Sequence, residues 1–257
     1  MLNTILLLCD LPINTEYMVT DIIEDCNPDN TLVITDCEEN IMKYALENYA
    51  ILFVSREDKF VSGVQYITDS LDCCDDSYFN LVFSRHNRLP LTVLHTERTI
   101  VREITVSDLE ELYVIYEDEL IKKYLEPLYE YEEEKLFVEK YIENMYGLYG
   151  YGLWIVEDKQ TGTIIGRAGI SIRNIDGKDC NELGYVIRRE FRNQGYAREI
   201  CRAILKYATE SLEIPDMYIV TEKDNRLSER LALSLGFEKI TETADEKKSY
   251  LIYYKKI

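Results

Sequence analysis

The spacing of apolar residues changes near residue 96, and this change constrains the fold more than any other feature of the sequence. Before it, short apolar runs alternate with amphipathic stretches, a pattern typical of a parallel sheet with crossover helices. The runs that predict buried strands are Thr4–Cys9, Thr31–Thr35, Ala50–Val54, Asn80–Phe83 and Leu91–Leu94, and the stretches that predict helices are Glu16–Asp25 and Glu38–Asn48. We therefore expect residues 1–96 to form a small open α/β domain.

Residues 97–257 predict a second domain with a different succession of elements. Ser107 is a candidate N-cap for its first helix, with Glu110 as the return partner of a capping box. The segment Asp158–Gly162 joins two strand-like runs and suits a hairpin turn. The predicted strands are Thr99–Ile104, Leu153–Glu157, Ile164–Ile172, Glu182–Arg189, Met217–Glu222 and Ser249–Lys256, and the other predicted helices are Tyr131–Tyr146, Ala197–Ser211 and Asn225–Leu235.

The net charge narrows the choice of partners. The 257 residues include 48 Asp+Glu and 29 Lys+Arg, which gives a formal net charge of −19. Phosphate backbones and anionic membrane surfaces repel such a chain, so we expect no nucleic-acid partner and no membrane partner. No stretch approaches the ~18 apolar residues that a membrane span needs. A cationic small molecule or a basic peptide is favoured instead.

The cysteines indicate a reducing compartment. The chain has 7 Cys and 2 His, and no CxxC pair. We therefore expect neither a disulfide framework nor a Cys/His metal site. The run Ile5–Cys9 has no basic segment before it, so it does not resemble a signal peptide. These features predict a cytoplasmic protein without a bound metal.

One segment carries the chemistry: a predicted strand from Glu182 leads through the loop Arg192–Ala197 directly into a helix. Such a loop leaves backbone N–H groups unpaired at a helix N-terminus, which creates an anion site suited to phosphate. Gly195 lets the backbone approach a ligand closely, and Ala197 keeps the wall small. From residue 188 to 206 the chain has six basic and two acidic residues, against its overall acidic charge. The alternative is an ordinary solvated helix face.

The loop fits the pattern [Q/R]-x-x-G-x-[G/A] rather than GxGxxG or GxxxxGK[ST]. Together with its surroundings, it makes residues 99–256 resemble the GNAT superfamily of N-acetyltransferases, in the branch of ribosomal-protein and polyamine acetyltransferases. The other matching segments are Trp154–Glu157, Gly166–Gly169, Glu182–Ile187, Asn225–Ser228 and Leu235–Phe237. The resemblance implies an α/β (α+β) fold. A mixed, mostly antiparallel sheet flanked by helices would follow a small open α/β domain with a parallel sheet.

The resemblance also implies acetyl-coenzyme A as cosubstrate, with no metal. In the family, this turn holds the diphosphate of the coenzyme, and the central strand pairs with its pantetheine arm through backbone groups. The residues to which the resemblance assigns coenzyme binding are Val186, Ile187, Arg188, Arg192, Asn193, Gln194, Gly195, Tyr196, Ala197, Arg198, Asn225 and Ser228.

Glu182 is the candidate general base for direct transfer of the acetyl group to an amine. A protonated amine cannot attack, and a carboxylate partly screened from water has a raised pKa that suits proton removal. Glu103 and Glu222 are alternatives, and a surface role at the strand end is the other interpretation of Glu182. The family often has a Tyr seven residues after the Asn of the later helix, whereas this chain has Ala232 there. Ser228, another Tyr or water would then protonate the leaving sulfur.

The expected acceptor is a primary amine of a small molecule or of a peptide N-terminus. The family forms the acceptor pocket from the first two helices and the following loop. From residue 108 to 143 the chain has 13 acidic and 4 basic residues, most densely at Glu130–Glu134. Carboxylates beside aromatic rings suit a cationic amine, although a solvated helical face is the alternative.

Two further hypotheses stay open at this point. Ala232 permits a non-catalytic acyl-coenzyme A-binding sensor or regulatory module. The first domain could instead be the functional centre and bind a partner, although Asp10 and Asp36, which follow predicted strands, give no catalytic pattern. The sequence leaves the oligomeric state open, and a homodimer is one option.

Overall fold

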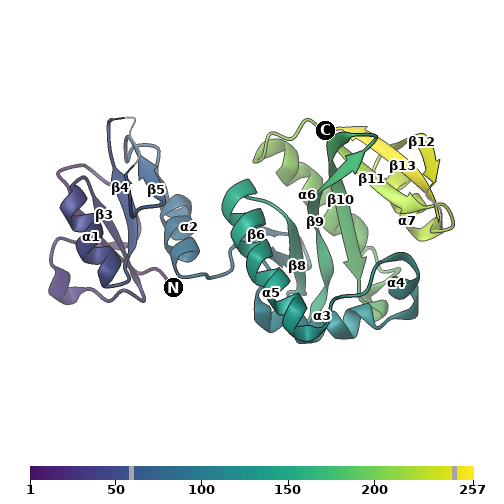
Figure 1. The fold of residues 1–257 in the computed structure, drawn as a ribbon, viewed down its shortest axis with the longest axis horizontal. Coiled ribbons are helices and arrows are strands. Elements are labelled where there is room, and N and C mark those ends of the chain that lie inside the picture. The colour runs from purple at the N-terminus through teal and green to yellow at the C-terminus, as the bar shows by residue number, and fades with distance from the viewer. Residues whose placement is uncertain (58–60, 245–247) are drawn as a thin grey trace. The chain divides into compact units, whose positions relative to one another are not determined.

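The computed structural model describes residues 1–57, 61–244 and 248–257. The chain divides into two compact units, Met1–Leu91 and Thr92–Ile257 (Figure 1). Each unit has its own sheet and its own buried apolar core. The chain is therefore a mixed α/β protein in which a smaller α/β unit precedes a larger one.

The first unit is a parallel sheet with the strand order β2-β1-β3-β4-β5. Its strands are β1 (Thr4–Leu8), β2 (Met18–Thr20), β3 (Thr31–Thr35), β4 (Ala50–Val54) and β5 (Tyr66–Thr68), and its helices are α1 (Glu38–Leu46) and α2 (Asp76–His86). Leu32 on β3 packs in the cluster that includes α2, and its neighbour Val33 packs in the cluster that includes α1. The sheet is thus covered on both faces, as parallel sheets require, and the prediction of a parallel sheet is confirmed.

Two local predictions for this unit are wrong. Asn80–Phe83 lies inside α2 rather than in a strand, because Phe79, Val82 and Phe83 form one buried face of that helix. Short apolar runs do not by themselves distinguish a buried strand from a helix. Glu16–Asp25, predicted as a helix, contains the strand β2 and a 3-10 turn.

The second unit begins earlier than the change in sequence pattern suggests. The strand expected at Leu91–Leu94 is present as β6 (Thr92–His95), but it pairs with β7 (Thr99–Arg102) and not with the first sheet. An antiparallel hairpin therefore opens this unit.

The second sheet has eight strands in the order β12-β13-β11-β10-β9-β8-β7-β6. After β6 and β7 come β8 (Leu153–Asp158), β9 (Ile164–Ile175), β10 (Lys178–Ile187), β11 (Asp216–Glu222), β12 (Glu238–Ala244) and β13 (Ser249–Lys256). The pair β10–β11 is parallel and the other pairs are antiparallel. This is the mixed, mostly antiparallel sheet that the sequence predicts, with β12 as a strand that it did not predict.

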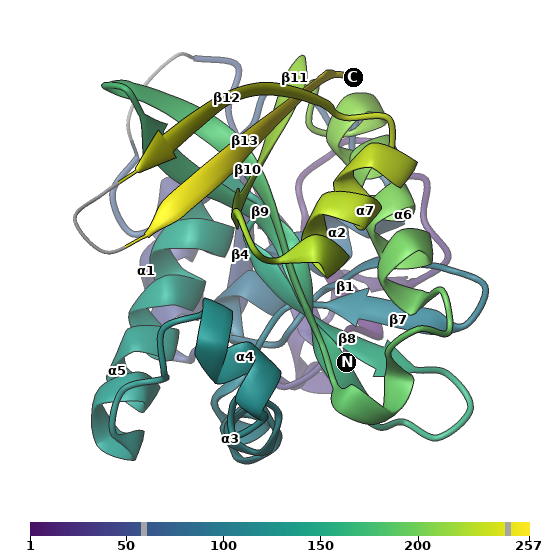
Figure 2. The ribbon, with the colours of Figure 1, turned by 90° about the vertical axis from the view of Figure 1, so that its right-hand side faces the viewer.

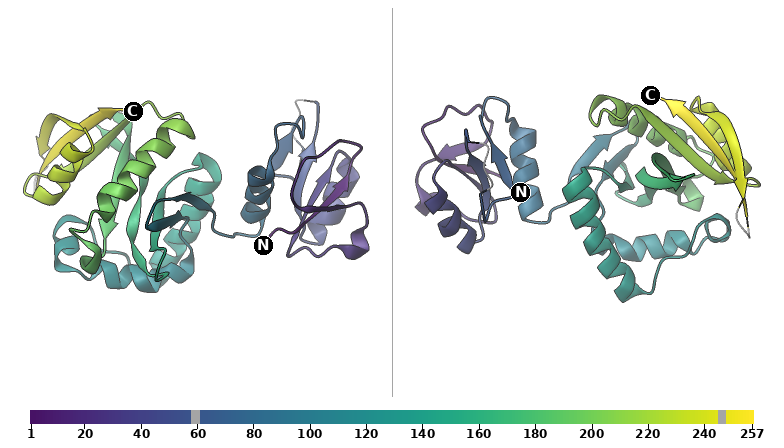
Figure 3. Two further views of the ribbon diagram at one scale, coloured as in Figure 1. Left: turned by 180° about the vertical axis from the view of Figure 1, so that it is seen from behind. Right: turned by 45° about the horizontal axis from the view of Figure 1, so that its top comes forward.

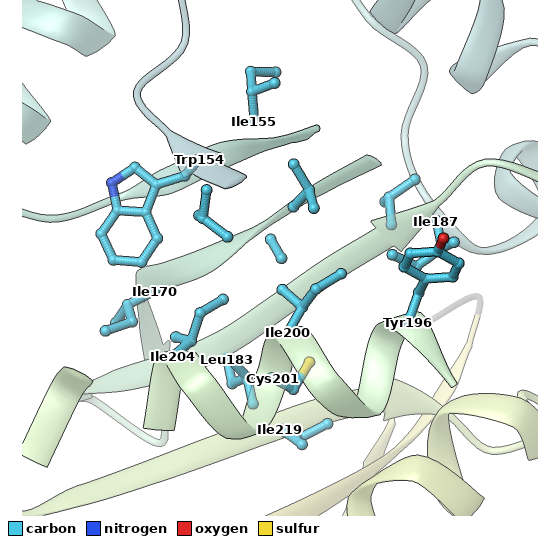
Figure 4. Close-up of a cluster of buried hydrophobic side chains, with 14 of the residues drawn as sticks. Trp154, Ile155, Ile170, Leu183, Ile187, Tyr196, Ile200, Cys201, Ile204 and Ile219 are labelled. Atoms are coloured by element: carbon cyan, nitrogen blue, oxygen red, sulfur yellow. The ribbon is translucent and has the colours of Figure 1, made fainter. Parts of the chain in front are cut away.

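Helices cover both faces of this sheet (Figures 2 and 3). The helices are α3 (Leu109–Tyr116), α4 (Glu119–Tyr124), α5 (Tyr131–Tyr141), α6 (Tyr196–Glu210) and α7 (Arg226–Ser234). Figure 4 shows Ile200 and Ile204 of α6 facing the strands beside Leu183. The helices α3 to α5 lie on the opposite face from α6 and α7, so each face of the sheet packs against its own set of helices.

The helical ends also differ in detail from the prediction. The capping box before α3 uses Thr105 and Asp108 rather than Ser107 and Glu110. The helix predicted to reach Tyr146 changes to a π-helical segment, Ile142–Tyr149, after α5. In the described part of the chain, no helix combines the length and apolar character needed to span a membrane.

Candidate functional site

The strands β10 and β11 diverge in the middle of the second sheet. Their parallel register consists of a single pair, Glu182 with Tyr218. By contrast, β10 stays paired with β9 from Lys178 to Ile187. Residues 183–187 therefore have no ladder partner on the β11 side among the described residues. A strand edge exposed in this way can pair with an extended ligand.

A cavity of about 640 Å³ opens at this divergence. The strands β10 and β11, the loop after β10 and the helices α4, α6 and α7 contribute to its walls. Of the sequence-predicted site residues, the cavity wall includes Glu182, Val186, Ile187, Arg192, Asn193, Gly195, Tyr196, Ala197, Arg198, Asn225 and Ser228, but not Arg188 or Gln194. Site residues that are up to 46 positions apart in the sequence, from Glu182 to Ser228, thus line a single cavity.

The loop before α6 presents unpaired backbone N–H groups. Asn193 and Gly195 adopt left-handed conformations, with φ values of 59° and 84°, and Gly195 immediately precedes the first residue of α6. No backbone N–H from residue 193 to 198 has a hydrogen-bond acceptor in the part of the chain that the structure describes. Consecutive free N–H groups at the start of a 15-residue helix favour an anion.

Arg98 supports this loop from the protein side. Its guanidinium donates to the Gln194 carbonyl at 3.1 Å, pairs with Glu199 at 2.7 Å and lies 3.9 Å from the centre of the Tyr196 ring. The Tyr196 hydroxyl in turn donates to Asp158 at 3.0 Å. The loop is therefore held in shape by the protein itself, which reduces the entropic cost of binding a ligand. Sequence reasoning missed Arg98, which lies 96 residues before Gln194.

Two arginines expected near the coenzyme are held by protein groups instead. Arg192 pairs with Asp118 at 2.8 Å and donates from Nε to the Ile187 carbonyl at 2.8 Å. Arg188 pairs with Glu111 at 2.7 Å, and its backbone N–H donates to the Ile165 carbonyl. The basic segment thus contributes less positive charge to the cavity than its composition predicts.

Glu182 lies where β10 and β11 come together. Its side chain is 14% exposed, and Nη1 of Arg173 is 3.3 Å from both carboxylate oxygens. Burial raises the pKa of Glu182, and the Arg173 guanidinium opposes this shift only in part. The carboxylate is therefore suited to accept a proton nearer neutral pH than an exposed one.

The two alternative bases are less suitable. Glu222 lines the same cavity, but it forms an ion pair with Lys248. Glu103 is buried, at 3% exposure, and does not line the cavity. Of the three carboxylates considered from the sequence, Glu182 has the geometry that suits a base.

Tyr185 is a cavity residue that the sequence did not single out. Its hydroxyl donates to Oγ of Ser228 at 3.0 Å, and burial raises its pKa, so the phenol is neutral near pH 7. Ser228 lies one helical turn before Ala232, on the same side of α7. Tyr185 therefore brings a phenol hydroxyl from β10 to the face of α7 that contains Ala232, the position where the family often has a Tyr.

The acidic cluster predicted to bind the acceptor does not line this cavity. Within Glu130–Glu134, Glu134 is buried and accepts the backbone N–H of Tyr129 at 3.0 Å. From this part of the chain, the wall includes Tyr116, Leu120, Ile121, Tyr124, Leu125 and Glu126. Arg167, Arg173 and Glu182 contribute from the strands. This part of the cavity wall thus has aromatic rings and charges of both signs.

The sequence profile of the acetyltransferase (GNAT) domain matches residues 98–238, more than half of the chain. The chain belongs to this family, which confirms the resemblance seen in its motifs. It is 31% identical over 146 residues to YkkB of Bacillus subtilis (strain 168), a protein described as uncharacterized, and the match covers 56% of this chain and 84% of YkkB.

Solved structures of acetyltransferases share the fold. A ribosomal-protein-S5-alanine acetyltransferase from Vibrio fischeri matches with a TM-score of 0.55 and 18% identity, over 63% of this chain and 95% of that one. The microcin C7 self-immunity acetyltransferase MccE, solved with acetyl-CoA and AMP, matches with a TM-score of 0.53 and 18% identity, over 63% of this chain and 93% of that one. The protein is thus an acyltransferase of the GNAT family with an additional N-terminal α/β unit.

Proposed function

We propose that the protein transfers the acetyl group of acetyl-CoA directly to a primary amine of a small molecule or of a peptide N-terminus. The observation that carries this proposal is that one cavity is lined by Asn193 and residues 195–198, whose backbone N–H groups are free, by the open edge of β10 and by Glu182. The seven cysteines are free thiols, which supports a reducing, cytoplasmic location.

The residues of the cavity fit the coenzyme. The N–H groups of residues 193–198 would hold its diphosphate, and Arg198 adds a positive charge to the same wall. The unpaired edge of residues 183–187 would bind the extended pantetheine arm, facing Asn225 and Ser228 on the opposite wall. The bound coenzyme supplies an activated acyl thioester.

Glu182 would take the proton from the attacking amine, directly or through a water molecule. Its raised pKa and its position beside the open strand edge support this role. Tyr185 would give its hydroxyl proton to the sulfur that leaves when the carbon–sulfur bond breaks, with Ser228 as its hydrogen-bonding partner. The chain would thus remove one proton from the nitrogen and supply one to the sulfur.

The decisive experiment measures free thiol released from acetyl-CoA in the presence of a panel of primary amines, with mass spectrometry of the products. We expect thiol release that depends on the amine, and a product heavier by one acetyl group. Stabilisation by acetyl-CoA without thiol release would instead support the sensor hypothesis, which Ala232 permits. No thermal stabilisation at millimolar acetyl-CoA would contradict both.

A further inference from the structure

Arg167 on β9 is a buried cation in the wall of the cavity. It is 7% exposed, and no other Arg or Lys is buried to this degree among the described residues. It lies opposite Val186 on β10 and Ile155 on β8, within the sheet next to the divergence. Its charge therefore faces a space that a ligand can enter.

Among the described residues, Arg167 lacks the ion pair that holds the other arginines of this region. No carboxylate in the described part of the chain forms an ion pair with Arg167, and its Nε has no hydrogen-bond acceptor there. Its neighbours are the phenols of Tyr116, Tyr141 and Tyr146, and the Tyr141 ring centre is 5.4 Å from the guanidinium carbon. Phenols are neutral near pH 7, so they do not offset the positive charge.

Other arginines of this region have the carboxylate partner that Arg167 lacks. Arg102 is held by Asp108 and Glu157, Arg192 by Asp118, and Arg173 by Glu182. Burying a charge without a partner is costly, and an incoming anion would offset that cost. The phosphates of the coenzyme are expected at residues 193–198, so the anion for Arg167 would come from the other substrate.

Arg167 and Glu182 emerge from the same face of the sheet. Arg167 is paired with Val186, which is four residues from Glu182 along β10, and residues an even number apart on a strand share a face. Four residues of strand correspond to about 13 Å at the backbone. Both side chains line the same cavity, so a molecule with an amine at Glu182 and an anion at Arg167 would extend along this face of β10.

We propose that Arg167 binds the carboxylate of the acceptor, so that the acceptor is an ω-amino acid or a short peptide with a free carboxylate rather than a polyamine. This inference rests on the proposed acetyl transfer. The substrate class follows from Arg167, which is the one buried cation of the cavity wall without a carboxylate partner among the described residues.

The test compares matched acceptors that differ only in the carboxylate. Thiol release from saturating acetyl-CoA is measured with β-alanine and β-alaninamide, and with glycylglycine and glycylglycinamide. We expect kcat/KM to be about tenfold or more higher for the free acid in at least one pair, because charge-assisted bidentate hydrogen bonds to Arg are strong. A ratio near one, or one that favours the amide, while thiol is released would overturn the inference and leave the acetyl-transfer proposal standing.

Variants assign the effect to Arg167. Arg167→Gln should bring the acid-to-amide ratio close to one without changing the Kd for acetyl-CoA. Lys248→Gln removes a cation that lines the same cavity and pairs with Glu222, and it should leave the ratio unchanged. If Arg167→Gln does not fold, Arg167→Lys provides a second measurement, because it keeps the charge and loses the bidentate geometry.

A binding measurement separates the inference from the proposed reaction. If no amine releases thiol, calorimetry on the coenzyme A-saturated protein compares the same acid and amide pairs. Tighter binding of the acids would support the carboxylate site although the reaction proposal fails. Equal or absent binding of both members of each pair would overturn the site as well.

Discussion

One end of the cavity is made of backbone, and the other is made of side chains. Near residues 193–198, free N–H groups converge, and their positions depend on the left-handed Gly195 and on the support from Arg98. Away from this loop, the wall consists of side chains such as Glu182, Arg167 and Tyr116, which come from different elements. A backbone-made end keeps its chemistry through most substitutions, whereas a single substitution alters the other end. The backbone-made end is therefore suited to a coenzyme that a whole family shares, and the side-chain end to an acceptor that differs from one member to the next.

The largest effect is expected at the side-chain end. Glu182→Gln should lower kcat/KM by about 10²- to 10⁴-fold, the range typical of general acid–base catalysis, and leave the Kd for acetyl-CoA unchanged. Burial raises the pKa of Glu182, and the base acts when ionised, so wild-type activity should fall as the pH drops through that raised pKa. The Gln variant should lose this acid limb of the pH profile. Glu222→Gln is the control, and an unchanged profile in Glu182→Gln would exclude Glu182 as the base.

The next largest effect is expected at the backbone end of the cavity, and only from a substitution that introduces a negative charge. Ala197→Glu should weaken acetyl-CoA binding about 10- to 100-fold, because a carboxylate beside the free N–H groups competes with the diphosphate and repels it. Ala197→Gln has nearly the same size without the charge and should bind the coenzyme more tightly than Ala197→Glu. Calorimetry measures both Kd values. Equal losses in the two variants would mean that the site responds to bulk and is not an anion site.

A smaller effect is expected from Tyr185, the proposed proton donor to the leaving sulfur. Tyr185→Phe should lower kcat about tenfold, less than the usual acid–base contribution because water or Ser228 can also protonate the sulfur, with little change in the Kd for acetyl-CoA. Tyr254→Phe removes a hydroxyl outside the cavity and serves as the control. Steady-state kinetics with a good acceptor measures both variants. If Tyr185→Phe keeps full kcat, water or Ser228 protonates the sulfur instead.

The smallest effect concerns stability. Asp118 caps α4 and pairs with Arg192, and Asp118→Asn keeps the cap while it removes the charge. We expect a loss of about 1 kcal/mol in the free energy of unfolding at pH 7. Burial alone would raise the pKa of Asp118, but Arg192 and the N–H groups of α4 hold it below its usual range.

The pH dependence of this loss follows from the lowered pKa. The stabilisation by Asp118 is present above the pKa of an unfolded Asp, about 3.9, and is lost as the pH falls through the lower folded-state value. In urea unfolding, the difference between wild type and Asp118→Asn should therefore begin to shrink as the pH falls below about 3.9 and vanish only below the lowered folded-state pKa of Asp118. A difference that persists in acid would mean that the ion pair is not its source.

The same contrast explains what the sequence could predict. The loop at residues 192–197 was recognisable because its chemistry depends on local conformation: a strand end, Gly195 and a helix start. Glu182 was found because it lies on the same strand. Arg98 was missed because it comes from a distant segment, and Arg167 and Arg173 were missed because the register between β9 and β10, which the sequence does not give, brings them to the site.

Pairing also explains the overestimated charge of the basic segment. Arg188 and Arg192 are matched by Glu111 and Asp118, each more than 70 residues earlier in the chain. A count of charges along one segment does not include such partners. In the first unit, Asn80–Phe83 shows the related limit for secondary structure, because four apolar-rich residues fit one face of a helix as well as a strand.

The position of β6 has a practical consequence for dissecting the protein. A fragment cut at residue 97, where the sequence pattern changes, would lack Thr92–His95 and would leave one side of β7 without its hydrogen-bonding neighbour. Uncovered strand edges recruit other chains, so such a fragment would tend to self-associate for reasons unrelated to catalysis. A fragment that begins at or before Thr92 keeps the hairpin and is the one whose oligomeric state would reflect the intact second unit.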